Sequence, residues 1–194
     1  MNKVYLQQRA IRFLIVSLGA TLWAAGCSHQ AAPVAAQPAP QQFRLTATIQ
    51  DLMEGQIDPS ADALWDSVAY ISNTTGVEDR QPRTEEQWQA VRTSAVTLIE
   101  ATNLLSMAGR HVAATDPPPG LGELSHPEIQ QRVTANHDSF VQFARSLQDA
   151  GLQALAAIDA KNPQALMDAG GTIDAACEAC HVTFWYPNQS RPGN

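Results

Sequence analysis

Apolar residues recur every three or four positions through most of residues 43–187, and proline or glycine interrupts the pattern between stretches. This spacing places apolar side chains on one face of an α-helix. We find no convincing strand alternation, and segment 73–82 has the composition of a loop. With 44% hydrophobic residues the chain can bury a core. The prediction is an all-α fold whose four amphipathic helices form an antiparallel bundle. The helices are expected over 43–72 with a break or kink near Pro59, 84 to about 109, 126 to about 158, and 163 to Pro187 at the latest.

The first residues have the pattern of an export signal. Three basic residues precede an apolar run from Phe13 to Ala25, which is too short to span a bilayer comfortably. The run ends in small residues before Cys27, which resembles the lipobox of bacterial lipoproteins, although Ala24 stands where that motif prefers Leu. We therefore expect a signal peptide over 1–26, a lipid on Cys27 and an exported, membrane-anchored protein on the periplasmic side. An ordinary signal peptide with an incidental cysteine is the alternative.

The rest of the chain divides by composition. Residues 27–42 are rich in Ala, Pro and Gln without apolar periodicity, which predicts a spacer between the anchor and the domain. The domain itself is expected over 43–187, followed by a short tail over 188–194.

The excess of acidic over basic residues indicates which kinds of partner the protein can bind. The chain has 12 basic and 19 acidic residues, and loss of residues 1–26 would take the formal net charge from −7 to −10. This argues against nucleic-acid binding, which needs a basic surface. It favours protein partners with basic patches, and membrane attachment through the lipid rather than through charge.

Cys177, Cys180 and His181 form a CxxCH motif, the attachment signature of c-type haem. Two thiols three residues apart on a helical turn can reach the two vinyl groups of one porphyrin, and the adjacent imidazole can ligate the iron. Other uses of two cysteines are a thioredoxin-like CxxC, a strained structural disulfide and a zinc site. The first lacks its strand–helix setting, and the last lacks a second paired cluster.

The motif lies on the last of the four predicted helices, close to the C-terminus. In this the chain resembles class II c-type cytochromes, the cytochrome c-prime group and its low-spin relatives, over roughly residues 43–187. The resemblance implies a left-handed up-down-up-down bundle with one covalent haem c near the C-terminal helix, and it allows a homodimer. One departure is that no basic residue follows His181 before Arg191. This puts gas-discriminating chemistry on the proximal side of the haem in doubt. The aromatic run 184–186 is expected to pack over the end of the bundle and shield the haem edge.

The second axial ligand separates possible functions, because a haem with two protein ligands suits electron transfer and an open site binds gases. The resemblance implies a Met on the first helix, and Met53 lies on its apolar stripe, although Met is also common core filler. His137 is the histidine rival, but its polar neighbours indicate a solvated face. The remaining Met and His residues are expected to pack, cap or face solvent: Met107, Met167, His111 and His126.

Haem propionates usually pair with Arg or Lys. Arg44 ranks first because it begins the helix that bears Met53; the other candidates are Arg83, Arg92 and Arg145. For each of them a solvated surface charge is the favoured alternative. Trp65 and Trp88 are expected to fill the core. The sequence thus predicts a single-electron carrier rather than an enzyme, serving redox partner proteins. The alternatives are a gas-binding or gas-sensing haem protein and a haem-stabilised structural lipoprotein.

Overall fold

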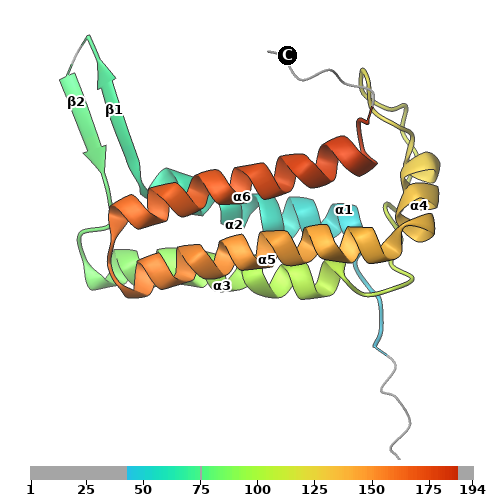
Figure 1. Ribbon diagram of the computed structural model, residues 1–194, viewed down its shortest axis with the longest axis horizontal. Coiled ribbons are helices and arrows are strands. Elements are labelled where there is room, and N and C mark those ends of the chain that lie inside the picture. The colour runs from blue at the N-terminus through green and yellow to red at the C-terminus, as the bar shows by residue number, and fades with distance from the viewer. Residues whose placement is uncertain (1–42, 75, 188–194) are drawn as a thin grey trace, which may run out of the picture. The chain divides into compact units, whose positions relative to one another are not determined.

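The computed structural model describes residues 43–74 and 76–187. This part of the chain is mostly helical, as predicted (Figure 1). The expected signal peptide (1–26), the lipidation residue Cys27, the rest of the spacer and the tail (188–194) lie outside the described residues. Within residues 43–74 and 76–187, no helix is both long enough and apolar enough to cross a bilayer.

The first helical region begins later than predicted. It consists of α1 (Ile49–Leu52), the π-helix η1 (Met53–Ile57) and α2 (Asp58–Ser67). Thr48 and Asp51 form a capping box, in which the Asp51 amide donates to Thr48 Oγ1 at 3.0 Å and the Thr48 amide donates to Asp51 Oδ2 at 2.8 Å. This cap fixes the helix start, so the residues from Phe43 onward precede the helix.

Pro59 neither breaks nor ends this helical region. Pro59 has no N–H to donate to the carbonyl of Gly55 four residues earlier, and its ring would crowd that carbonyl in an α-helix. The widened turn of η1 resolves the conflict, because the Asp58 amide donates to the carbonyl of Met53, five residues back. Pro59 then lies in the first turn of α2, where proline is well tolerated.

A two-stranded hairpin replaces the predicted helix end and loop. Strands β1 (Ala69–Asn73) and β2 (Gly76–Arg80) pair antiparallel and project beyond the helices (Figure 1). Tyr70, Ile71 and Val77 favour strand, and Gly76 adopts a φ of 141° that suits glycine beside the turn. The expectation of a helix to residue 72 and a loop over 73–82 is therefore wrong. Every residue of β2 is exposed, so the hairpin lacks the buried face that makes a strand recognisable in sequence.

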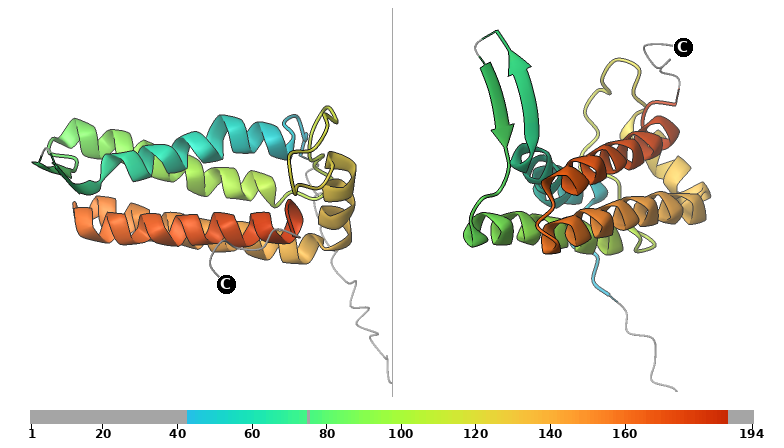
Figure 2. Two further views of the ribbon diagram at one scale, coloured as in Figure 1. Left: turned by 90° about the horizontal axis from the view of Figure 1, so that it is seen from above. Right: turned by 60° about the vertical axis from the view of Figure 1, so that its left-hand side comes forward.

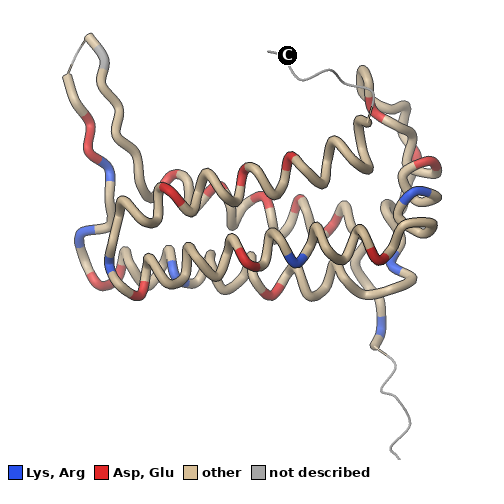
Figure 3. Tube along the Cα trace, viewed as in Figure 1, with Lys and Arg blue, Asp and Glu red and all other residues tan. Residues whose placement is uncertain are grey.

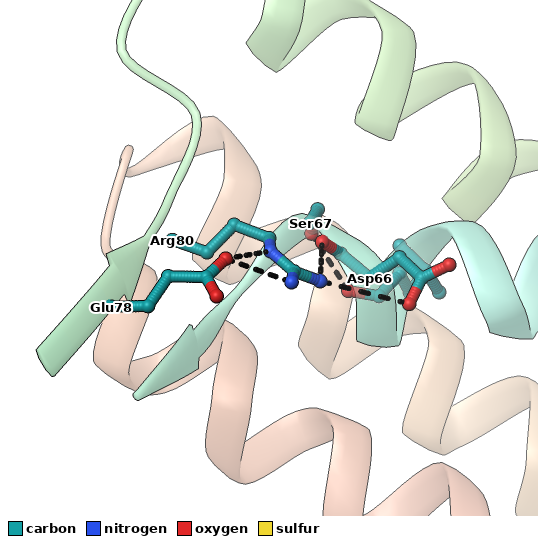
Figure 4. Close-up of polar contacts among 5 residues, drawn as sticks. Asp66, Ser67, Glu78 and Arg80 are labelled. Atoms are coloured by element: carbon teal, nitrogen blue, oxygen red, sulfur yellow. Dashed lines mark hydrogen bonds and ion pairs between the residues drawn. The ribbon is translucent and has the colours of Figure 1, made fainter. Parts of the chain in front are cut away.

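Arg80 lies where the hairpin returns to the helices. Its Nη2 lies 2.8 Å from Glu78 Oε1 and its Nη1 lies 3.9 Å from Asp66 Oδ1 at the end of α2 (Figure 4). All three side chains are well exposed, so these ion pairs add little stability.

Helix α3 (Glu85–Leu105) begins at the predicted capping box, in which the Gln87 amide donates to Thr84 Oγ1 and the Thr84 amide donates to Gln87 Oε1. It ends at Leu105, four residues before Gly109. Its predicted apolar stripe is buried.

The predicted third helix is two helices, α4 (His126–Ala135) and α5 (His137–Asp159). They meet at Asn136, whose φ of −127° and ψ of 38° are not helical. The Asn136 side chain donates to the carbonyl of Arg132 at 3.0 Å, a local bond that competes with helix continuation. As a result α4 turns across the end of α5 and the neighbouring helices (Figure 2).

Helix α6 (Pro163–Phe184) begins as predicted at Asn162, whose Oδ1 accepts from the Ala165 amide at 3.1 Å. It packs along α5, and α5 in turn packs along α3 (Figure 1). Helix α2 contacts both α3 and α6, which places one shared core between these helices. Gly151 allows the close approach of α5 to α3, because a Cβ there would lie 2.9 Å from Ile99 Cγ1.

Candidate functional site

The CxxCH residues lie in the last turns of α6 and face a cavity of about 220 Å³. Cys177, Cys180 and His181 are all half-buried and all line this cavity. The opposite walls come from η1, α2, α3 and α5. The cavity therefore lies where the helical elements of the domain converge.

The walls of this cavity are largely apolar. They contain aliphatic and aromatic side chains from four elements: Ile57, Ala61, Leu105, Phe140, Phe143, Ala144 and Leu147. Apolar walls with polar groups at a few positions are typical of a site that binds an organic ligand.

Met53 and His181 are brought to the same place from opposite ends of the domain sequence. Both line the 220 Å³ cavity, and both line a neighbouring cavity of about 330 Å³ that is bounded by the loop containing Pro117–Pro119. Met53 is half-buried and is the first residue of η1. π-Helical turns occur frequently at functional sites. The sequence offered one signal for this turn, the Gly55-x-x-x-Pro59 spacing.

Burial shapes the chemistry of the two thiols. It raises the pKa of Cys177 to about 11, with a further contribution from Asp58 and Asp174, and it raises the pKa of Cys180 to about 12. Both residues are therefore neutral thiols at neutral pH. Redox-active CxxC pairs depend on a thiolate, so this environment disfavours that alternative use of the two cysteines.

Carboxylates are the charged groups of the site. Asp58, Asp174 and Glu178 line the 220 Å³ cavity, and no Lys or Arg of the described chain lines either this cavity or its neighbour. Burial raises the pKa of Asp58, while the nearby His181 opposes that shift. Acidic positions are spread along the helices and basic positions are few (Figure 3).

The predicted basic partners of the site lie elsewhere. Arg44 is exposed, precedes α1 instead of beginning it, and lines neither cavity. Arg83 lies 3.7 Å from Asp79 and Arg92 lies 2.8 Å from Asp159, each in an exposed ion pair. Arg145 is also exposed. The ranking of Arg44 assumed that the helix starts at residue 43, which the Thr48 cap prevents.

The aromatic run after the motif holds the end of α6. Phe184 is buried and makes edge-to-face contacts with Phe140 and Phe143, at centroid distances of 5.4 and 5.9 Å. The rings of Trp185 and Tyr186 lie tilted against His181 at 5.8 and 6.0 Å. The predicted packing is therefore confirmed for Phe184, while the shielding of a haem edge stays a prediction.

Hydrogen bonds fix the same region. The Tyr186 hydroxyl donates to Glu178 Oε2 at 2.7 Å, and burial together with this bond raises the pKa of Tyr186 to about 12. The Leu124 amide donates to the carbonyl of Trp185 at 2.8 Å, and Arg132 Nη1 donates to the carbonyl of Thr183 at 3.2 Å. His181 is therefore carried by a segment that is tied to the preceding loop and to α4.

The two tryptophans differ. Trp88 is buried, as predicted. Trp65 is 37% exposed, lines the 220 Å³ cavity and donates from Nε1 to the carbonyl of Gly170 at 3.0 Å, so the expectation that it fills the core is wrong. A Cβ at Gly170 would lie 3.0 Å from Trp65 Cδ1, so the indole and the backbone of α6 are in close contact.

The remaining Met and His residues lie away from the 220 Å³ cavity. Met107 Sδ lies 3.2 Å from Arg110 Nη2, and Met167 is exposed on α6. His126 Nδ1 lies 2.7 Å from the carbonyl of Thr115, and it lines the 330 Å³ neighbour. His111 is exposed. His137 is half-buried, and its Nε2 is buried without a hydrogen-bond partner among the described residues, so the predicted solvation is wrong for this ring nitrogen.

Within residues 43–74 and 76–187, no three His, Cys, Asp or Glu side chains converge as a metal site would require. Scans of this chain against known protein families, curated proteins and solved structures found no match.

Proposed function

We propose that this protein is a c-type haem protein that carries single electrons, with one haem attached through thioethers to Cys177 and Cys180. The observation that carries the proposal is the convergence of the CxxCH turn and Met53 on one apolar cavity. A haem bound there would supply one-electron chemistry through its iron, and His181 would be one axial ligand.

The proposal extends to the fold. We infer that the four principal helical segments, 49–67, 85–105, 137–159 and 163–184, form an antiparallel four-helix bundle of the class II cytochrome type with the haem near the C-terminal helix. The packing of α5 against both α3 and α6, and of α2 against α3 and α6, supports this arrangement. In bundles of this kind, cofactor sites are built from side chains on facing helices.

The side chains around the motif fit such a group. Apolar walls exclude water from a macrocycle, and neutral thiols are the form in which buried cysteines can remain without a metal or a counter-charge. Thioether bonds would remove these thiols from titration altogether. The carboxylates Asp58, Asp174 and Glu178 would favour the more positive, oxidised state of a haem iron bound here.

Met53 is the proposed second axial ligand, since it lines both cavities that His181 lines. Met53→Leu removes the sulfur and keeps the side-chain volume. We expect the near-infrared sulfur-to-iron band to disappear in the variant while the haem stays attached. Met167→Leu, at an exposed position of α6, is the matched control and should retain the band. A band that persists in Met53→Leu would reject Met53 as the ligand.

The competing function is gas binding at an open site, which the 330 Å³ cavity beside Met53 and His181 could accommodate. Rapid CO binding to the reduced, unmutated protein would favour it. Slow binding that becomes rapid in Met53→Leu would support the electron carrier, because the sulfur would then be what closes the site.

Substitutions of the two motif cysteines test whether the haem is covalently attached. In a host that attaches haem c, Cys177→Ala and Cys180→Ala should each weaken the attachment, and the double variant should lose the covalent haem, as read by mass and by haem staining after denaturation. Cys27→Ser is the matched cysteine control and should keep the haem. A double variant that keeps covalent haem would refute the proposal.

The proposed location is the periplasmic side of a membrane, through a signal peptide over 1–26 and a lipid on Cys27. Cys27→Ser should then move the haem protein from the membrane fraction to the soluble fraction. The acidic chain would meet redox partners through their basic patches, and raised ionic strength should slow such reactions.

A further inference from the structure

A buried arginine lies at the end of the domain where α1 begins and α3 ends. Arg110 is 6% exposed. Its Nε donates to the carbonyl of Leu104 at 2.9 Å, its Nη1 donates to the carbonyl of Ala47, and its Nη2 lies 3.2 Å from Met107 Sδ. A guanidinium has five N–H groups, so these contacts leave part of its donor capacity unused.

In the described part of the chain, no acidic side chain pairs with this guanidinium. All 19 acidic residues fall within residues 43–74 and 76–187, and none of them forms an ion pair with Arg110. A buried, uncompensated charge is costly, and hydrogen bonds to neutral carbonyls offset only part of that cost. An anion beside Arg110 would offset the rest.

The space for an anion is a cavity of about 290 Å³ that Arg110 lines together with His137. Among the described residues, His137 Nε2 is buried and has no hydrogen-bond partner. His137 is also the first residue of α5, a helix of 23 residues whose N-cap Asn136 makes no side-chain capping bond. Within residues 43–74 and 76–187, no Asp or Glu lines the cavity.

The rest of the lining is mostly apolar, including Ile49, Val133 and Phe140, which distinguishes this cavity from a site for a small inorganic anion. At about 30 Å³ for each water, it has room for several non-hydrogen atoms besides the charged group. Leu105 and Phe140 are nearly fully buried and line both this cavity and the one that contains the CxxCH residues, so they stand between the two.

We propose that the Arg110–His137 cavity binds a short-chain organic carboxylate. The carboxylate accepts hydrogen bonds from the Arg110 guanidinium and from His137 Nε2–H, and the alkyl chain lies against Val133 and Phe140. The site is separate from the proposed haem and does not depend on it.

The test is titration of the purified full chain with sodium butyrate, with sodium chloride at equal ionic strength as the reference, followed by calorimetry and by the melting temperature. We expect saturable binding of butyrate. Arg110→Gln and His137→Leu should each weaken it, by about 10- to 100-fold for Arg110→Gln, which removes a charge-assisted hydrogen bond. Arg92→Gln, at an exposed arginine, is the matched control and should bind as the unmutated chain does.

Since Arg110→Gln also removes bonds that hold the chain, His137→Leu and the NMR shift of His137 Nε2 on butyrate addition provide independent readings. Two results would overturn the proposal: no saturable binding, or equal binding by the unmutated chain and both site variants. The titration is repeated on the haem-free Cys177→Ala, Cys180→Ala form. Equal affinity in the two forms is expected, whereas binding only to the haem-free form would assign Arg110 to a carboxylate of the cofactor and overturn the free-ligand proposal.

Discussion

Replacement of Phe184 by Leu tests how the end of α6 is held, one turn beyond His181. Phe184 is 2% exposed and contacts two rings edge to face, Phe140 at 5.4 Å and Phe143 at 5.9 Å. Leu keeps much of the apolar burial and removes both aromatic contacts. Each such contact is worth about 0.5–1.5 kcal/mol beyond area burial, so the expected loss in free energy of unfolding is about 1–3 kcal/mol.

The assay is urea unfolding of the purified protein, with the melting temperature as a second reading. For a domain of this size, about 1 kcal/mol corresponds to a fall of roughly 2–4 °C. Phe43→Leu is the matched control, because Phe43 is 72% exposed, and its replacement should leave the free energy of unfolding within about 0.5 kcal/mol of the original.

A double-mutant cycle isolates the ring contact. The Phe140→Leu and Phe184→Leu changes should be non-additive, with a coupling of about 0.5–1.5 kcal/mol, because the two rings contact each other directly. Additive effects, or a loss below about 0.5 kcal/mol for Phe184→Leu alone, would refute the reasoning that these rings hold the helix end.

Three further predictions concern the two buried thiols, the Tyr186 hydroxyl and the exposed hairpin. In a haem-free Cys27→Ser chain, Cys177 and Cys180 should react with a thiol reagent at pH 8 far more slowly than free cysteine does. The reason is that pKa values of about 11 and 12 leave about one thiol in a thousand or fewer ionised at this pH. Rates like those of free cysteine would contradict the burial argument. Tyr186, whose pKa rises to about 12 from an ordinary value of 10.0, contributes stability that is fully present below pH 10 and is lost as the pH rises towards 12. Urea midpoints of the haem protein over that range should therefore fall more steeply than those of Tyr186→Phe, and parallel curves would be the adverse result. The hairpin is shortened by replacing residues 70–79 with Asn-Gly, so that a two-residue turn joins the paired positions Ala69 and Arg80. This should change the free energy of unfolding by less than about 1 kcal/mol, because the hairpin is exposed and its ion pairs are solvated. A larger loss would show that the hairpin supports the helices.

Helices with a strong stripe and a side-chain cap could be predicted from sequence. Thr84 with Gln87 marked the start of α3, and Asn162 before Pro163 marked the start of α6, because both signals are local hydrogen bonds. The start at Thr48 was missed although Asp51 completes a capping box, since Leu45 extends the apolar period backwards beyond the cap.

Local backbone interactions explain the other differences between the predicted and the observed helices. Asn136 interrupts a continuous apolar period through its bond to the Arg132 carbonyl, so periodicity alone merges α4 with α5. Pro59 suggested a break or a kink; there is no break, because the π-helical turn before it keeps the chain helical. The hairpin buries too little to impose an alternating pattern on its residues.

For the candidate site, spacing alone marked the CxxCH motif, and the family resemblance together with one helix face singled out Met53; the structure brings both to one cavity. The charged groups around the cavity could not be predicted from sequence, because their positions depend on packing between segments that are distant in the chain. The acidic lining around Asp58, Asp174 and Glu178, the position of Arg44 outside the site, and the buried pair of Arg110 and His137 all required the structure.

The most direct test of the central proposal is a pyridine haemochrome spectrum of the full chain, produced in a host that attaches haem c. The prediction is one haem per chain with the spectrum of two thioethers, and no free thiol at Cys177 or Cys180. A colourless protein from such a host, or a haemochrome with unreacted vinyl groups, would contradict the account.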